Sequence, residues 1–228
     1  MKNKLRRFAV WLWREWVRPL ALAGAIIFPM KSALADWNYV PSGSMEPSIR
    51  PGELVLVNKL AYDLKVPFTT HHLTEWGDPA RGDVVVLFSP ADEVRLVKRV
   101  VGLPGDTVEM RDERLWINGR ALDYSAASAA DLAGAETSAV VASESLGTHQ
   151  HAVKALPGRP ALRTFGPIRV PAGQYFVLGD NRDNSNDSRY IGFIDRARIV
   201  GRASAVIASI DLEHYGKPRF SRFLHPIQ

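Results

Sequence analysis

Short segments in which apolar and polar residues alternate, or in which apolar residues dominate, recur along the chain after residue 50. They are bounded by Gly, Pro or Asp, which is typical of β-strands. We expect strands at residues 53–58, 83–88, 94–101, 107–110, 114–117, 174–178 and 199–208. Asn118-Gly119 is a tight-turn signal after one of them. Because no long amphipathic helix separates these segments, the sequence predicts a mainly β protein of folded antiparallel sheets or a barrel-like body.

The N-terminal region has a different pattern. Residues 19–30 carry no charge, follow a segment rich in Lys, Arg and Trp, and precede Lys31. One interpretation is a cleaved secretory signal with Ala33-Leu34-Ala35 as its cleavage site. The other is an uncleaved membrane anchor that ends at Leu34 and has tryptophans at one interface. Both interpretations export the rest of the chain, because positive charge stays inside.

The region from 111 to 169 departs from the strand pattern. Residues 125–147 are mostly Ala, Ser and other small residues, which bury little apolar surface. The sequence therefore divides into a basic N-terminus with an apolar segment at 1–36, a β-rich body at 37–110 and 170–210, an insertion or second subdomain at 111–169, and a basic and aromatic tail at 211–228.

Charge and composition exclude several classes of protein. The net charge of +5 arises at the N-terminus: seven Lys or Arg and one Glu in residues 1–31 contribute +6, which leaves −1 for residues 32–228. A body without excess positive charge is not expected to bind nucleic acid. The 228 residues include no cysteine, which excludes disulfides, zinc-thiolate sites and a cysteine nucleophile.

The segment from Pro41 to Ile49 carries candidate chemistry. Two prolines and Gly43 fix a tight turn that holds Ser44 in place. Ser42 and Ser44 are ordinary turn residues unless a base is available, because an unassisted hydroxyl is too weakly acidic to attack an amide. The six histidines lie in polar or irregular segments, and no motif marks one of them as that base.

A lysine held neutral is another possible base. Lowering a lysine pKa from about 10.4 to about 7.5 costs roughly 4 kcal/mol, which lies within the range that burial produces. Alternation along the strand at 94–101 places Lys98 on one face with Leu96 and Val100, and Arg99 on the other. A lysine that protects an edge strand from aggregation and a buried ion pair are the alternative interpretations.

Three longer blocks occur in the chain. They are Pro41-Ser-Gly-Ser-Met45, Lys98-Arg-Val-Val-Gly-Leu-Pro-Gly-Asp106 and Gly179-Asp-Asn-Arg-Asp-Asn-Ser-Asn-Asp-Ser-Arg189. Together with Arg81-Gly-Asp-Val-Val-Val86, they resemble the blocks of type I signal peptidases, the membrane-anchored serine endopeptidases that remove signal peptides from exported preproteins. The resemblance covers residues 40–110 and 170–205 and leaves the insertion unmatched.

The resemblance implies roles for individual residues. Ser44 would be the nucleophile and Lys98 the general base. The Ser44 backbone amide and the Ser42 hydroxyl would form the oxyanion hole. Ser185 would orient the Lys98 amine. Charge pairs would brace the site through Asp180, Asp187 and Arg189.

The block at 179–189 also has the alternating Asp and Asn of a calcium loop. Against that interpretation, Ser188 stands where a loop starting at Asp183 needs glycine, and Ile194 stands where it needs a bidentate glutamate. We therefore expect no metal and no cofactor.

The resemblance further implies a substrate and a location. Signal peptides would be cut after small residues, with Ala at −1 and −3, beside a shallow apolar pocket lined by Val40, Pro41, Met45, Ile49, Leu96 and Val97. The protein would lie in the bacterial inner membrane with one uncleaved span, its N-terminus cytoplasmic and its catalytic domain periplasmic. Membrane lipid would be a partner, and the tail at 211–228 would touch headgroups or be solvated. Self-cleavage after Ala35 is a further hypothesis.

Two other functions remain as alternatives. One is a related Ser/Lys protease, either a pilin or conjugation-type processing peptidase or a self-cleaving repressor. A repressor would need a DNA-reading helix-turn-helix, for which residues 1–39 show no pattern. The other is a non-enzymatic exported β-module with a cleaved signal.

Overall fold

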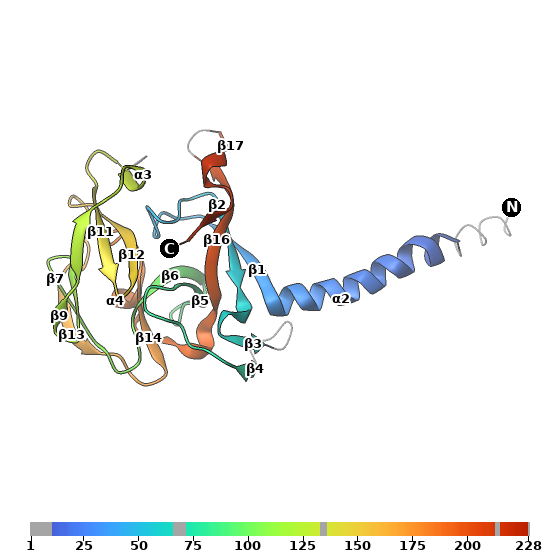
Figure 1. The fold of residues 1–228 in the computed structure, drawn as a ribbon, viewed down its shortest axis with the longest axis horizontal. Helices are drawn as coiled ribbons and strands as arrows, with labels where there is room; N and C mark the ends of the chain where they lie inside the picture. The colour runs from blue at the N-terminus through green and yellow to red at the C-terminus, as the bar shows by residue number, and fades with distance from the viewer. Residues whose placement is uncertain (1–10, 66–71, 133–135, 213–214, 228) are drawn as a thin grey trace.

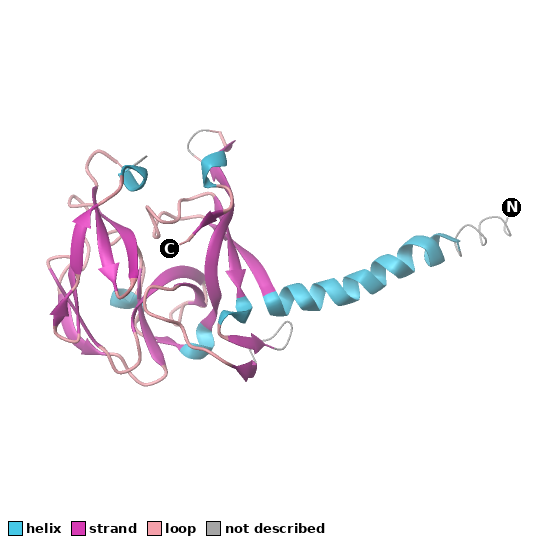
Figure 2. Ribbon diagram, in the orientation of Figure 1, coloured by secondary structure: helices cyan, strands magenta, loops and turns pink. Residues whose placement is uncertain are grey.

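A helical arm projects from a β-rich body (Figure 1). The computed structural model describes residues 11–65, 72–132, 136–212 and 215–227. The arm consists of a π-helical turn, η1 (Trp13–Val17), and α2 (Arg18–Leu34), which leads directly into the first strand. Strands form most of the regular structure of the body (Figure 2), and this confirms the predicted mainly β fold.

The largest sheet is antiparallel and open. Its main path has the order β1-β2-β16-β5-β6-β14-β15, and β17 and β18 pair with the C-terminal half of β16. Among the described strands, the edge strands β1 and β15 do not pair with each other, so the sheet is not the closed barrel that was one expectation. The strands are β1 (Ala35–Val40), β2 (Glu53–Asn58), β5 (Val84–Phe88), β6 (Arg95–Gly102), β14 (Gln174–Leu178), β15 (Ile194–Asp195), β16 (Ile199–Asp211), β17 (Lys217–Pro218) and β18 (His225–Pro226).

The region from 111 to 169 is built of strands. A three-stranded sheet has the order β10-β11-β12, and a four-stranded sheet has the order β13-β7-β8-β9. Because β7 starts at Thr107, the domain boundary expected at 110–111 falls inside a strand. The strands are β7 (Thr107–Arg111), β8 (Arg114–Ile117), β9 (Arg120–Ala121), β10 (Asp123–Ala126), β11 (Val140–Leu146), β12 (His149–Ala155) and β13 (Phe165–Arg169).

Short elements connect the sheets. A two-stranded sheet forms from β3 (Asp63–Lys65) and β4 (His72–Glu75). The short helices are α3 (Ala129–Leu132), α4 (Ser188–Ile191), η2 (Lys59–Ala61), η3 (Arg196–Arg198) and η4 (Phe220–Arg222).

The N-terminal helix differs from the expectation of a transmembrane segment. In the part of the chain that the structure describes, no helix combines the length and the apolar character needed to cross a membrane.

The C-terminal segment is attached to the main sheet. Besides the pairing of β17 and β18 with β16, Arg222 forms a bidentate ion pair with Glu53, at 2.8 and 3.0 Å. Arg219 Nε also donates to Ser209 Oγ at 2.9 Å. The expectation of a solvated or lipid-touching tail therefore missed the Arg222–Glu53 ion pair and the strand pairing that hold this segment against the sheet.

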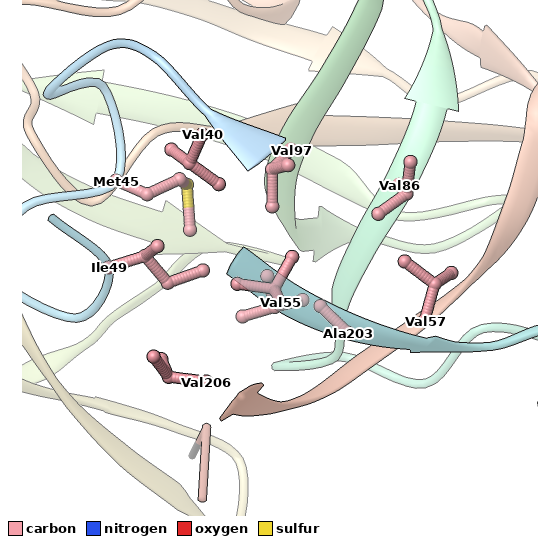
Figure 3. Packing of buried hydrophobic residues seen from close by; sticks show 10 residues of the cluster. Val40, Met45, Ile49, Val55, Val57, Val86, Val97, Ala203 and Val206 are labelled. Carbon is pink, nitrogen blue, oxygen red and sulfur yellow. The ribbon is translucent and has the colours of Figure 1, made fainter. Parts of the chain in front are cut away.

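One of the three buried apolar clusters lies under the loop that follows β1. Met45 and Ile49 of this loop are completely buried. Figure 3 shows how they pack with side chains of the sheet; the cluster, which we call the loop cluster, consists of Val40, Met45, Ile49, Val55, Val57, Val84, Val86, Val97, Ala203 and Val206. Because two side chains of the loop are fixed in the core, the backbone at residues 43–48 has a defined position on the sheet.

Candidate active site

Ser44 and Lys98 meet although they are far apart in the sequence. Ser44 lies in the loop after β1, just before the buried Met45, and Lys98 lies in β6 just after the buried Val97. The Lys98 Nζ atom donates a hydrogen bond to Ser44 Oγ at 2.8 Å and another to the Val97 carbonyl oxygen at 2.9 Å. Packing of Met45 and Val97 in the loop cluster therefore aligns the hydroxyl with the amine.

The environment of Lys98 favours its neutral form. The residue is 2% exposed, and among the described residues no carboxylate lies within 4 Å of its Nζ atom. Burial lowers the pKa of Lys98 to about 8, while the more distant charges of Asp187 and Asp180 act in the opposite direction. An amine with this pKa accepts a proton near neutral pH, as a general base requires.

Ser185 lies beside the pair but makes a different set of contacts from the one that the resemblance implies. A Cβ atom added to Gly179 would lie 2.3 Å from Ser185 Oγ and 2.5 Å from the Ser44 carbonyl oxygen, so Gly179 separates the two serines at close range. Ser185 Oγ is buried and has no hydrogen-bond partner among the described residues. In this arrangement the Val97 carbonyl, and not Ser185, accepts the second hydrogen bond from Lys98.

Ser42 is exposed at the start of the same loop. One residue, Gly43, separates it from Ser44 along the chain.

Two buried ion pairs hold the segment that follows β14. Asp180 accepts two hydrogen bonds from Arg99, both at 2.8 Å, and each side chain is 1% exposed. Asp187 accepts two from Arg189, at 2.8 and 2.9 Å, and a third from the Gly179 backbone amide at 3.0 Å. Arg99 has no predicted role, although a second cation in an otherwise apolar strand indicates a buried partner of opposite charge.

The carboxylates of the 179–189 segment are occupied by arginines. Asp183 pairs with Arg163 at 3.0 Å, in addition to the Asp180 and Asp187 pairs. Among the described residues, no group of three or more acidic or histidine side chains has an arrangement that could hold a metal ion. The segment therefore uses its alternating acidic residues for ion pairs.

The insertion also reaches the site, which the sequence did not indicate. Lys154 of β12 is 4% exposed, and its Nζ atom bonds to Glu46 of the Ser44 loop at 2.8 Å and to Glu136 at 3.2 Å. The Lys154 backbone amide donates to the Asp180 carbonyl at 2.8 Å. One residue of the insertion thus contacts both segments that flank the Ser44–Lys98 pair.

The residues expected to line the pocket fall into different environments. Val40, Met45, Ile49 and Val97 share the loop cluster, where each is at most 6% exposed (Figure 3). Leu96 packs against a separate cluster that includes Val85, Val100 and Tyr175, and Pro41 is exposed. Leu96 and Val97 thus lie in different clusters, because neighbouring side chains of a strand point to opposite faces, and the substrate pocket stays a prediction.

Comparison with known proteins places this geometry in a family. Residues 13–208 match the family described as signal peptidase, peptidase S26. The chain is 41% identical over 216 residues to signal peptidase I of Pseudomonas fluorescens, covering 86% of this chain and 73% of that protein. It is 33% identical over 193 residues to signal peptidase I T of Bacillus subtilis, covering 84% and 83%. A crystal structure of a signal peptidase I from Enterococcus faecalis aligns at 36% identity with a TM-score of 0.37, covering 56% of this chain and 97% of that one.

Proposed function

Because the chain belongs to the S26 signal peptidase family and is a serine endopeptidase that removes signal peptides from preproteins, we propose that Ser44 is its nucleophile and Lys98 its general base. The 2.8 Å hydrogen bond between Lys98 Nζ and Ser44 Oγ carries this proposal. With the pKa of Lys98 at about 8, half of the molecules hold a neutral amine at pH 8. An exposed lysine would be neutral in only about 0.4% of molecules at that pH.

The reaction begins with transfer of the Ser44 proton to the Lys98 amine. Ser44 Oγ attacks the carbonyl carbon of the scissile peptide, and the carbonyl oxygen becomes an oxyanion. The Ser44 backbone N–H and the Ser42 hydroxyl donate to that oxyanion. The Lys98 ammonium then protonates the leaving amine, and the C–N bond breaks to leave an acyl group on Ser44.

The second half of the reaction uses the same base. After the leaving peptide departs, neutral Lys98 takes a proton from a water molecule, and the resulting hydroxide attacks the acyl carbon. The ammonium returns its proton to Ser44 Oγ as the ester breaks. Asp180 and Asp187, paired with Arg99 and Arg189, keep the neighbouring backbone in place.

Specificity follows from the surroundings of the loop. We propose that small side chains, Ala at −1 and −3, fit against the part of the loop that carries Ser42, because Met45 and Ile49 fill the space beneath it. Ser185 acts from the far side of Gly179. We propose that it orients the Lys98 amine, and its buried hydroxyl without a hydrogen-bond partner among the described residues supports this.

We also propose that the helical arm attaches the enzyme to the bacterial inner membrane, with the N-terminus cytoplasmic and the body periplasmic. The basic residues before the apolar run 19–30 support this orientation. Exposed Trp11, Trp13 and Trp16 support a position of this end of the arm at one membrane interface. Alkaline carbonate washing of membranes tests attachment: release of the full chain into the wash contradicts it.

The catalytic assignment is tested by Ser44→Ala and Lys98→Met on a purified preprotein. Each is expected to lower the cleavage rate by at least about 10³-fold, because the nucleophile and its base act as a unit. Ser221→Ala and Lys217→Ala, at exposed positions, are matched controls that should cleave normally. Cleavage by either Ser44→Ala or Lys98→Met at the unmodified rate would exclude this pair.

A further inference from the structure

Asn181 connects the 179–189 segment to the Ser44 loop. Its backbone N–H donates to the Ser44 carbonyl oxygen at 3.1 Å, and its side-chain Nδ2 donates to the Gly43 carbonyl oxygen at 3.0 Å. The residue is 1% exposed. One buried residue therefore holds two consecutive carbonyl groups of the catalytic loop.

Asn181 is itself fixed from the other side. The Lys154 backbone amide donates to the Asp180 carbonyl at 2.8 Å, and the Arg182 amide donates to the Lys154 carbonyl at 2.8 Å. These bonds form a bridge between β12 and Asn181. The amide side chain thus extends from a rigid strand-like support toward the loop.

The Gly43 carbonyl and the Ser44 N–H belong to the same peptide group. A peptide group is planar and trans, so its C=O and N–H point in opposite directions and move together. The Gly43 oxygen accepts bonds from Asn181 Nδ2 and from the Glu46 amide, the latter at 3.2 Å. Fixing this oxygen therefore fixes the direction in which the Ser44 N–H points.

We propose that Asn181 is a positioning residue of the oxyanion hole, which holds the Gly43–Ser44 peptide group so that the Ser44 N–H faces the oxyanion. This inference rests on the proposed role of Ser44 as nucleophile. Donation into the Gly43 oxygen also polarises the peptide group, which strengthens its N–H as a donor. Asn181 acts through the peptide group and does not contact the reacting atoms.

The orientation of the side chain supports positioning over simple packing. Asn181 Oδ1 is buried and has no hydrogen-bond partner among the described residues. An unpaired buried acceptor costs about 1–3 kcal/mol. Turning the amide around would place Oδ1 against the Gly43 oxygen, where two acceptors repel. Asn181 thus directs its Nδ2 donor to the Gly43 carbonyl oxygen, although its Oδ1 acceptor remains unpaired among the described residues.

The test compares Asn181→Ala, Asn181→Asp and the control Asn186→Ala in the full-length enzyme. Asn186 lies in the same segment and is exposed, so its variant makes the same chemical change away from the loop. Asn181→Asp keeps the size of the side chain and removes the donor, which separates hydrogen bonding from packing. Cleavage of a preprotein is measured at alkaline pH, where Lys98 is neutral.

We expect both Asn181 variants to lower kcat by about 10- to 100-fold, less than the loss of an oxyanion donor itself. KM should stay within about twofold, because the bond acts on the transition state. The midpoint of the Asn181→Ala pH profile should match the unmodified enzyme, since Lys98 keeps its surroundings. Asn186→Ala should behave as the unmodified enzyme does.

Three results would overturn the inference: unchanged kcat in Asn181→Asp, a loss that appears only in KM, or a loss in Asn181→Ala alone, which would indicate packing. Ser44→Ala separates this inference from the proposed function. An inactive Ser44→Ala with fully active Asn181 variants refutes only the positioning role. An active Ser44→Ala refutes the catalytic assignment on which it rests.

Discussion

Lys98 is the side chain whose protonation decides activity. Its neutral form is favoured because the amine is buried, and its two hydrogen bonds go to a hydroxyl and a carbonyl, neither of which carries a charge. Because the active form is the unprotonated one, activity must rise with pH. The sequence pattern predicted burial of this lysine from its apolar neighbours, and the family resemblance supplied Ser44 as its partner.

The pH dependence of cleavage follows from this pKa. We expect kcat/KM to rise about tenfold per pH unit up to a midpoint near pH 8, where burial has set the pKa of Lys98, and then to level off. Initial cleavage rates between pH 5.5 and 9.5 measure the profile. A rate that is constant down to pH 6, or a midpoint close to that of a free lysine, would show that Lys98 is not the base.

Burial of Lys98 should also carry a cost in stability. Its pKa is about 8 in the folded protein and about 10.5 in the unfolded chain, so the unfolded state binds more protons between about pH 8 and pH 10.5. The cost is full below pH 8 and disappears above about pH 10.5. We expect Lys98→Met to be inactive yet up to about 3 kcal/mol more stable than the unmodified enzyme at pH 7.

Urea unfolding at pH 7 and pH 10 measures this difference. The advantage of Lys98→Met should shrink as the pH rises, because the lysine of the unmodified enzyme loses its buried charge and with it the cost in stability. Lys217→Met, at an exposed position of β17, is the matched control and should show no such pH dependence. A Lys98→Met protein that is less stable than the unmodified enzyme at both pH values would contradict a stability cost from burial of the Lys98 amine.

At the scale of elements, alternation of apolar residues located the strands of the main sheet. The predicted segment 53–58 coincides with β2, 83–88 begins one residue before β5, and 94–101 begins and ends one residue before β6. The Asn118-Gly119 turn joins β8 to β9, as predicted. These strands have one or both faces in an apolar core. Their apolar residues therefore follow the pattern from which strands are predicted.

The strands of the insertion could not be predicted in the same way. β11 and β12 bury polar side chains, namely Glu144, His151 and Lys154. A pattern that treats polar residues as exposed therefore describes these strands as irregular. Contacts between segments that are distant in sequence, such as Lys154 with Glu46, depend on side-chain geometry that no local pattern contains.

The Lys154–Glu46 pair joins β12 to the catalytic loop. The Lys154 side chain is 5% exposed and that of Glu46 is 26% exposed, so the pair is only partly screened by water. We expect Lys154→Met and Glu46→Gln each to destabilise the protein, and the double variant to lose less than the sum. Residues in direct contact of this kind couple by about 0.5–3 kcal/mol.

Urea unfolding of the two single variants and the double variant gives the coupling energy. Glu136→Gln is the control, because Glu136 is the more exposed partner of Lys154, at 63%, and exposed ion pairs contribute little. Additive effects of Lys154→Met and Glu46→Gln would mean that the pair does not link β12 to the loop.

At the scale of the whole molecule, a buried polar network joins the insertion to the catalytic sheet. Glu144 of β11 bonds to Arg182 at 2.7 Å, and the His151 Nε2 atom lies 3.4 Å from Glu144 and 3.8 Å from Asp180. Asp180 in turn binds Arg99, the neighbour of Lys98. The insertion is therefore connected to the active site through charges that are removed from water.

The protonation states of this network set its response to acid. Burial by itself would raise the pKa of Glu144, but Arg182 and His151 hold it well below its usual value. Arg99 likewise holds the pKa of Asp180 below its usual value, against the effect of burial. The pKa of His151 is lowered by burial and by Arg99, so this imidazole is neutral in the folded protein at neutral pH.

Stability should therefore fall in two steps as the pH decreases. Below about pH 6.5, His151 is protonated in the unfolded chain but stays neutral where it is buried in the folded protein. The unfolded state then binds more protons, which favours unfolding. Below about pH 4.3 the unfolded carboxylates protonate while Glu144 and Asp180 remain charged, which favours unfolding further. The variant His151→Gln should lack the loss of stability that comes from His151. It should keep the loss at lower pH that comes from Glu144 and Asp180.

Urea unfolding at pH 7.5, 5.5 and 4.0 compares the unmodified enzyme with His151→Gln and with His225→Gln, a control at an exposed histidine. Between pH 7.5 and 5.5, the unmodified enzyme and His225→Gln should lose more stability than His151→Gln. Between pH 5.5 and 4.0, all three should lose further stability, because Glu144 keeps its partner Arg182 and Asp180 keeps its partner Arg99 in each of them. Equal losses in the first interval would mean that His151 is protonated in the folded protein, and the network would then carry one more positive charge between the insertion and the catalytic sheet.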